Sequence, residues 1–148
     1  MAGNTNPQFT KQGNIDSVLV TAANTSSQGG GTVATDIFKA FTADATNGSF
    51  VETVRFIPTA TAPTTTTATV GRVFISSVGS GATTSANTFL VAEVTLPAVA
   101  ADNASAAVYP IDVPVNARLE AGQFILVTNH AAPAANTAWR ALVIGGDY

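Results

Sequence analysis

The sequence predicts an all-β fold, in which eight short strands form one antiparallel sandwich. Short runs of β-branched and aromatic residues recur along the chain, and loops rich in Gly, Asn, Pro and Thr separate them. No long stretch places apolar side chains at the spacing of a helical stripe. Because 148 residues is the usual length of one domain, we expect a single domain over residues 15–148.

Each predicted strand is a run of apolar and β-branched residues that ends at a turn-forming residue. Eight short strands at even spacing fit a jelly roll, in which two antiparallel sheets pack together. The strands are expected at residues 16–22, 35–42, 50–57, 68–76, 88–96, 108–113, 123–128 and 137–144.

Proline and glycine indicate where these strands should end. Asn47-Gly48 is the strongest short hairpin signal in the chain, so the strands on either side are expected to form a hairpin. Pro58 is expected to end the third strand, and Pro110 places the sixth strand at a sheet edge or a bulge. Strict alternation within the third strand puts Val51 on the face opposite Val54.

The composition excludes several classes of protein. Only 10% of the residues are charged and the net charge is -3, so the chain lacks the basic stripe that nucleic-acid binding requires. There is no run of about 20 apolar residues to span a membrane. The N-terminus has neither the basic nor the apolar segment of a signal peptide, and we expect none. We therefore predict neither a nucleic-acid nor a membrane partner.

Few side chains are candidates for chemistry. The only histidine, His130, has neither a nucleophile nor an orienting carboxylate near it in the sequence, so we interpret it as a solvated or interface loop residue. Glu52 and Glu93 are candidates for a pair of glycosidase carboxylates. The competing interpretation is that each is an outward charge or forms an ion pair with Arg55 or Arg72.

Metal binding is also weakly indicated. Asp102 and Asp147 could each lend an oxygen to Ca²⁺ at a subunit contact, but the spacing of a calcium-binding loop is absent. The chain has no cysteine, and a single histidine does not make a zinc site. The prediction is a protein that is not an enzyme, with no catalytic, cofactor or metal site.

One run of residues resembles a known element. Leu119–Val127, Leu-Glu-Ala-Gly-Gln-Phe-Ile-Leu-Val, resembles the segment that enters the penultimate strand of trimeric jelly rolls of the C1q and tumour-necrosis-factor type. There the glycine makes the turn that launches the strand. This resemblance implies a homotrimer, and a low surface charge suits interfaces depleted of charged residues.

Over residues 16–148 the chain also resembles small structural proteins of tailed bacteriophages. The motifs that carry the resemblance are Thr21-Ala-Ala-Asn-Thr25, Val54-Arg-Phe56, Arg72-Val-Phe-Ile75, Glu93-x-x-Leu-Pro97, the Leu119–Val127 run and Trp139 ahead of Gly145-Gly-Asp-Tyr148. Such proteins are similar to capsid decoration, or cement, proteins, which sit as trimers on the outer surface of the head.

The resemblance implies a non-enzymatic virion protein, made in the host cytoplasm without a signal peptide. Its partners would be the major capsid protein and further copies of itself. The alternative is a tail or fibre component that binds a host-surface glycan. Trp139 would then be a platform on which a sugar stacks, whereas a strand tryptophan otherwise packs in the core or an interface.

Residues 1–14 are polar and lack periodicity, so we expect an extended N-terminal arm. Such an arm could add a strand to a sheet edge of the capsid or of a sister subunit, where main-chain hydrogen bonds supply affinity without charge. The alternative is an unattached tail. The predicted capsid or subunit contacts are Gln8, Phe9, Thr10, Lys11, Trp139 and Tyr148.

Overall fold

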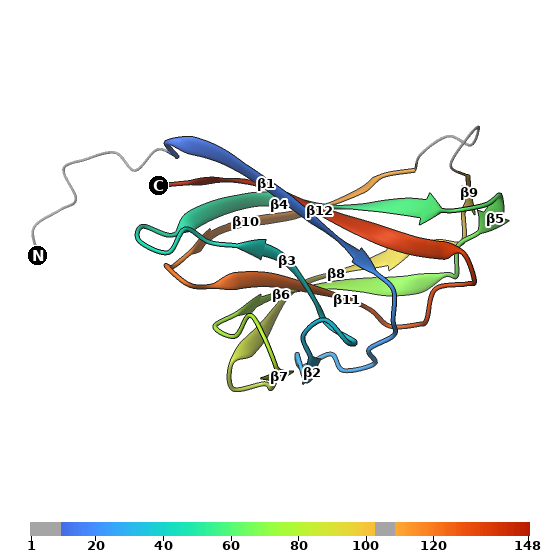
Figure 1. Ribbon diagram of the computed structural model, residues 1–148, viewed down its shortest axis with the longest axis horizontal. Coiled ribbons are helices and arrows are strands. Elements are labelled where there is room, and N and C mark those ends of the chain that lie inside the picture. Colours follow the sequence, from blue (N-terminus) through green and yellow to red (C-terminus); the bar gives the residue numbers. More distant parts are fainter. Residues whose placement is uncertain (1–9, 103–108) are drawn as a thin grey trace, which may run out of the picture.

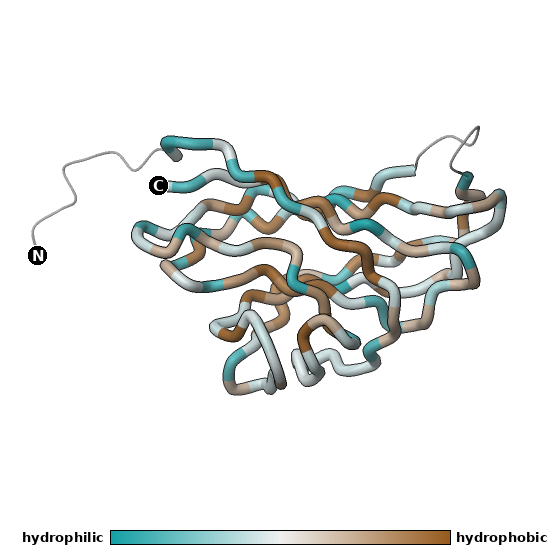
Figure 2. Tube along the Cα trace, in the orientation of Figure 1, coloured by the Kyte–Doolittle hydropathy of each residue, from teal (hydrophilic) through white to brown (hydrophobic). Residues whose placement is uncertain are grey.

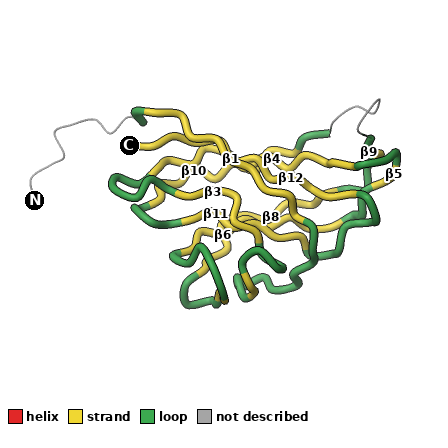
Figure 3. The backbone as a smooth tube through the Cα atoms, viewed as in Figure 1, coloured by secondary structure: helices red, strands yellow, loops and turns green. Residues whose placement is uncertain are grey.

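Strands and loops make up the whole of residues 10–102 and 109–148, the parts of the chain that the computed structural model describes (Figure 3). No helix in these residues is long and apolar enough to cross a membrane. The prediction of an all-β antiparallel fold is confirmed, since all pairings between the named strands are antiparallel.

All eight predicted strands are present, and seven of them have one or both ends shifted. They are β1 (Gln12–Val20), β3 (Phe38–Thr42), β4 (Ser49–Ala60), β6 (Thr69–Ser76), β8 (Thr88–Leu96), β10 (Ile111–Leu119), β11 (Phe124–Asn129) and β12 (Thr137–Asp147). Four strands of two residues each were not predicted, because two residues are too short to show a period. They are β2 (Gly31–Thr32), β5 (Thr64–Thr65), β7 (Ala82–Thr83) and β9 (Ala100–Ala101).

The eight long strands form two four-stranded sheets that pack face to face (Figure 1). Sheet A has the order β1-β12-β4-β10, and sheet B has the order β3-β11-β6-β8. The edge strands meet in pairs, because β1 contacts β3 and β10 contacts β8. The short strands pair as β2 with β7 and β5 with β9.

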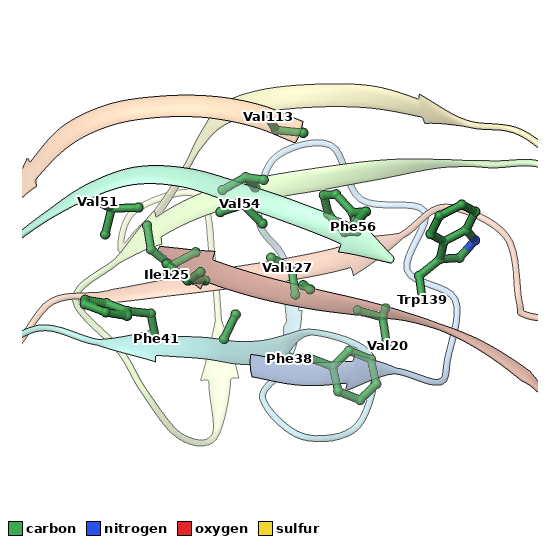
Figure 4. Packing of buried hydrophobic residues seen from close by; sticks show 14 of the residues in the cluster. Val20, Phe38, Phe41, Val51, Val54, Phe56, Val113, Ile125, Val127 and Trp139 are labelled. Carbon is green, nitrogen blue, oxygen red and sulfur yellow. The ribbon is translucent and has the colours of Figure 1, made fainter. Parts of the chain in front are cut away.

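The core lies between the two sheets and is built from alternate residues of the long strands. Figure 4 shows these inward side chains, with Trp139 at one end of the cluster. The largest of those that are less than 2% exposed in the main cluster are Trp139, Phe41, Phe56, Leu96, Leu119, Ile125, Val20, Val51 and Val54.

A bulge in β4 makes one predicted face wrong. Val51 and Val54 are both fully buried, although strict alternation would place them on opposite faces. Between the pairs Thr53–Ile144 and Val51–Gly145, Glu52 is an extra residue on β4, which resets the alternation. Gly145 is needed here, because a Cβ at this position would lie 2.4 Å from the carbonyl oxygen of Phe50.

Asn47-Gly48 makes a turn, but the predicted hairpin is wrong. The strand before the turn, β3, belongs to sheet B and the strand after it, β4, belongs to sheet A. Asp44 stabilises the turn, because its Oδ1 accepts hydrogen bonds from the backbone N–H of Thr46 at 3.0 Å and of Asn47 at 2.7 Å. Gly48 has a φ of 76°, a conformation that favours glycine.

The sixth strand, β10, lies at the edge of sheet A and contains a bulge, as predicted, but the prolines do not act as expected. Strand β4 continues past Pro58 to Ala60. Proline is tolerated there because β10 pairs with β4 only as far as Phe56, so that among the named strands Pro58 pairs with β12 alone. The proline inside the edge strand β10 is Pro114, not Pro110.

Strand β1 begins four residues before the predicted Asp16. Its residues 12–14 pair with residues 145–147 of β12, so this part of the predicted arm belongs to sheet A. The backbone N–H of Lys11 also donates to the carbonyl oxygen of Asp147 at 2.7 Å. Residues 1–9 of the predicted arm lie outside the described residues.

Candidate functional site

The outer face of sheet A carries a grid of side chains that the register defines. Across the sheet, Ile15 lies beside Ile144, which lies beside Thr53. Two residues further along, the row is Ser17, Leu142, Arg55 and Asp112, and the next row is Leu19, Arg140 and Ile57. The inward neighbours of these residues form the core, so the grid points outward.

Much of this face is apolar and uncovered. Ile15 is 65% exposed and Leu19 is 39% exposed. No described strand packs across the face, which lies along the upper side of the molecule in Figure 1. Figure 2 shows, in brown, the apolar segments along β1 and the strands beside it. An apolar sheet face of this kind is a candidate site for another protein surface.

The charges on this face are nearly balanced. Arg55 makes a two-point contact with Asp112, with Nε donating to Oδ1 at 2.6 Å and Nη2 donating to Oδ2 at 2.8 Å. These hydrogen bonds hold the pKa of the Asp112 carboxyl below its usual value, and the charge of Arg55 acts in the same direction. Arg140 donates to Ser17 Oγ at 3.3 Å and forms no ion pair within the described residues.

A surface pocket of about 400 Å³ lies at one end of the same face. It forms where the end of β1, the end of β4 and the start of β12 meet. Thr59 Oγ1 donates to the carbonyl oxygen of Ala138 at 3.0 Å, and the backbone N–H of Thr61 donates to the carbonyl oxygen of Asn136 at 3.0 Å. The lining includes Leu19, Thr59, Ala60, Asn136, Ala138 and Arg140.

The outer face of sheet B, by contrast, is covered by the protein's own loops. Ile37, Phe74 and Leu126 are fully buried in a second, smaller core on this side. Ile37 belongs to the loop that contains β2. The loop before β7 lies on Phe124, since a Cβ at Gly79 would be 2.6 Å from the Phe124 ring. In Figure 1 β2 and β7 lie below sheet B.

A polar cluster anchors this cover, and it includes the histidine and one of the predicted carboxylates. Arg72, whose side chain is 8% exposed, donates from Nε to Glu93 and from Nη1 to the carbonyl oxygen of Asn24 at 3.3 Å. Its Nη2 lies 3.3 Å from Nδ1 of His130, an exposed loop residue. Arginine only donates, so Nδ1 accepts in this contact. The cluster therefore holds the loop of Asn24 against sheet B.

The two carboxylates considered for glycoside hydrolysis belong to different sheets. Glu93 binds Arg72 on sheet B, which agrees with its interpretation as an ion-pair partner. Glu52 is the bulged residue of β4 in sheet A. Arg55 pairs with Asp112, a partner that the sequence analysis did not consider.

No group of three or more potential metal ligands occurs in residues 10–102 and 109–148. The Asp147 carboxylate accepts hydrogen bonds from Asn14 Nδ2 at 3.0 and 3.1 Å, and another from Ser49 Oγ. These donors tie β1 and β4 to the end of β12, so Asp147 has a structural partner on each side.

The structure separates the predicted contact residues. Gln8 and Phe9 lie outside the described residues, whereas Thr10 and Lys11 are exposed beside the end of β12. Tyr148 is near them, half-buried, with the Arg118 guanidinium carbon 5.0 Å from its ring centre. Trp139 is 1% exposed and packs in the core, so its side chain offers no stacking platform to a sugar and no surface to a partner.

Sequence reasoning did not identify the apolar outer face of sheet A. The signal was present in β12, where Leu142 and Ile144 alternate with Ala141 and Val143. A strand that is apolar on both sides is typical of a strand buried on both faces.

No protein-family model matches this chain, and comparisons with curated proteins and with solved structures also give no match.

Proposed function

We propose that this protein is a non-enzymatic structural protein of a bacteriophage particle, a capsid decoration protein that binds the outside of the head as a homotrimer. In this role it strengthens contacts between major capsid subunits. The observation that carries the proposal is the apolar outer face of sheet A, which the described residues leave uncovered, while they cover the outer face of sheet B. An exposed apolar face of this kind is typical of a subunit that packs against other proteins in a larger assembly.

The order of the strands supports the jelly-roll form of the sandwich. When the eight long strands are numbered along the chain, sheet A has the order 1-8-3-6 and sheet B has the order 2-7-4-5. Successive strands mostly cross from one sheet to the other, as in the double-sheet jelly rolls of viral capsid proteins. The motifs that resemble phage structural proteins lie within these strands and the loops between them.

The proposal is tested on phage particles that carry this protein. Immunogold labelling with an antibody against the full chain should place gold over the heads, in many copies per particle. Gold at the tail or fibre tips would instead support the glycan-binding alternative, and unlabelled particles would overturn both.

A second measurement tests the strengthening role. Heads from which the protein has been removed should release DNA at a lower temperature than intact heads, and the purified chain should restore the original temperature. Heads that are equally stable with and without the protein would overturn the cement role, even where the protein is bound.

A further inference from the structure

Sheet A has one edge that is regular along its whole length. Within the described residues, the edge strands of the two main sheets are β1 and β10 in sheet A and β3 and β8 in sheet B. A bulge interrupts the pairing of three of them, at Ala40 in β3, at Val91 in β8 and between Pro114 and Ala117 in β10. Strand β1 instead pairs with β12 over nine residues without a shift of register. Because bulges hinder the addition of a further strand, β1 is the edge most open to it.

The free edge of β1 presents backbone groups as well as apolar side chains. The backbone N–H of Ser17 donates to the carboxylate of Asp16 at 2.7 Å, so it points away from β12. Since N–H groups alternate in direction along an antiparallel pair, those of Gly13, Ile15 and Leu19 also point away from β12. No described strand pairs with this side of β1. Ile15 and Leu19 therefore combine exposed apolar side chains with backbone donors that an added strand can use.

We propose that residues 1–9 of a neighbouring copy add a strand to this edge, and that this exchange closes the homotrimer. The inference rests on the homotrimer proposed above and assigns its interface to β1. A segment that leaves one copy and pairs with the next makes a head-to-tail contact, which forms a closed ring where the rotation allows. Main-chain hydrogen bonds supply the affinity of such an added strand.

Residues 1–9, which we call the N-terminal segment, fit this edge in length and in starting point. Nine extended residues span about 30 Å, which is also the length of β1 with its nine residues. The backbone N–H of Lys11 donates to the carbonyl oxygen of Asp147 in β12 at 2.7 Å. The described chain therefore begins beside the start of β1, at the edge of sheet A, and the N-terminal segment departs from there.

The composition of the N-terminal segment also suits this edge. It contains no Asp, Glu, Lys, Arg or His, so pairing would bury no charged side chain. Asp16 is the one charged residue of β1, and it is exposed with its carboxylate on the N–H of Ser17. Pro7 is the one residue of the segment without an N–H, and a proline fits an edge strand when its nitrogen faces away from the neighbour.

The test measures the molar mass of the protein in solution by light scattering coupled to size-exclusion chromatography. Deletion of residues 2–9 removes the added strand, and Ile15→Pro removes a donor from the free edge. The Ile15 N–H faces away from β12, so this proline leaves the hydrogen bonds within sheet A intact. Each variant should shift the protein from three copies to one. Ile15→Thr is the matched control, because it also removes the apolar side chain but keeps the N–H, and it should remain a trimer.

Mixing the deletion variant with Ile15→Pro gives the most specific result. The first retains a working edge and the second retains a working N-terminal segment, so the mixture should form a complex with one copy of each and no larger ring. This complex also shows that both variants are folded. A mixture that stays monomeric would overturn the inference.

Amide hydrogen exchange, followed by NMR, locates the added strand. The N–H groups of Ile15 and Leu19 should exchange slowly in the wild type and at least tenfold faster in the deletion variant. Val18, whose N–H faces β12, is the internal control and should exchange at the same rate in both. A wild-type monomer in which Ile15 is protected would mean that the segment covers the edge of its own copy, and would overturn the exchange.

The outcomes separate this inference from the proposed function. Trimers that persist after the deletion, or in Ile15→Pro, would overturn this interface and leave the decoration role standing. A wild-type monomer would overturn both the proposed trimer and this interface. Labelling of phage heads tests the location on the particle independently of either result.

Discussion

The outer faces of the two sheets carry similar side chains, but they differ in how far other parts of the protein cover them. Both carry large apolar side chains in their strands, yet Leu126 on sheet B is fully buried and Leu19 on sheet A is 39% exposed. The loops that contain β2 and β7 fold over sheet B and make a second core there. The comparison teaches that residues 10–102 and 109–148 cover one of the two apolar faces and leave the other exposed.

The same difference separates the two arginine–carboxylate pairs. On sheet B, Arg72 is nearly buried and has two further contacts, although the side chain of its partner Glu93 is 44% exposed. Arg55 and Asp112 lie on the open face of sheet A, with both side chains substantially exposed. Since exposed pairs are screened by water, only the pair on sheet B should contribute clearly to folding.

The largest expected difference is between two leucines. Leu126→Ala should lower the free energy of unfolding by about 2–5 kcal/mol, because it leaves a cavity in the second core. Leu19→Ala, measured on the monomeric chain, should cost less than about 1 kcal/mol, because its side chain is already partly in water. Urea unfolding followed by circular dichroism measures both. Equal losses would show that the two faces are equally covered.

The two ion pairs should differ by less. Glu93→Gln removes the charge that faces a buried guanidinium, and should cost about 1–3 kcal/mol. Asp112→Asn makes the same chemical change on the open face, and should leave the urea midpoint unchanged within error. A midpoint that falls as far in Asp112→Asn as in Glu93→Gln would contradict the proposed difference.

The smallest expected effect is on the titration of Asp112. Its pKa is lowered below the ordinary value of 3.8, mainly by hydrogen bonds from Arg55. The contribution of this exposed pair to stability is small; it is present above about pH 3.8 and is lost as the pH falls through the lowered pKa. Arg55→Met should raise the pKa of Asp112, measured by NMR from the carboxyl carbon shift. An unchanged pKa would mean that Arg55 is not the cause.

Local patterns predicted the strands well and their partners poorly. The bounds of β8 coincide with the predicted residues 88–96, because a long apolar run ends there at Pro97. Asn47-Gly48 was correctly predicted to be a turn, but the turn joins two sheets rather than two neighbouring strands. Its residues determine how the backbone bends, whereas strand pairing depends on which surfaces become buried together.

The candidate site was harder to predict than the strands. Trp139 was proposed as a contact because of its residue type, yet register places it opposite Pro58 and Val20 with its side chain in the core. Leu19 was assigned only to an apolar run and Ile15 to no predicted strand, and the exposure of both depends on loops elsewhere in the chain. No local pattern shows which sheet those loops will cover.

The sequence by itself determined the all-β class, the positions of eight long strands and the low charge of the surface. These properties follow from alternation, turn residues and composition, which act between near neighbours in the chain. The tertiary structure alone decided that Val51 and Val54 face the same way, that Pro58 is tolerated within β4, and that sheet A keeps an open apolar face. Each of these depends on contacts between residues far apart in the sequence, because burial is a property of the assembled sheets.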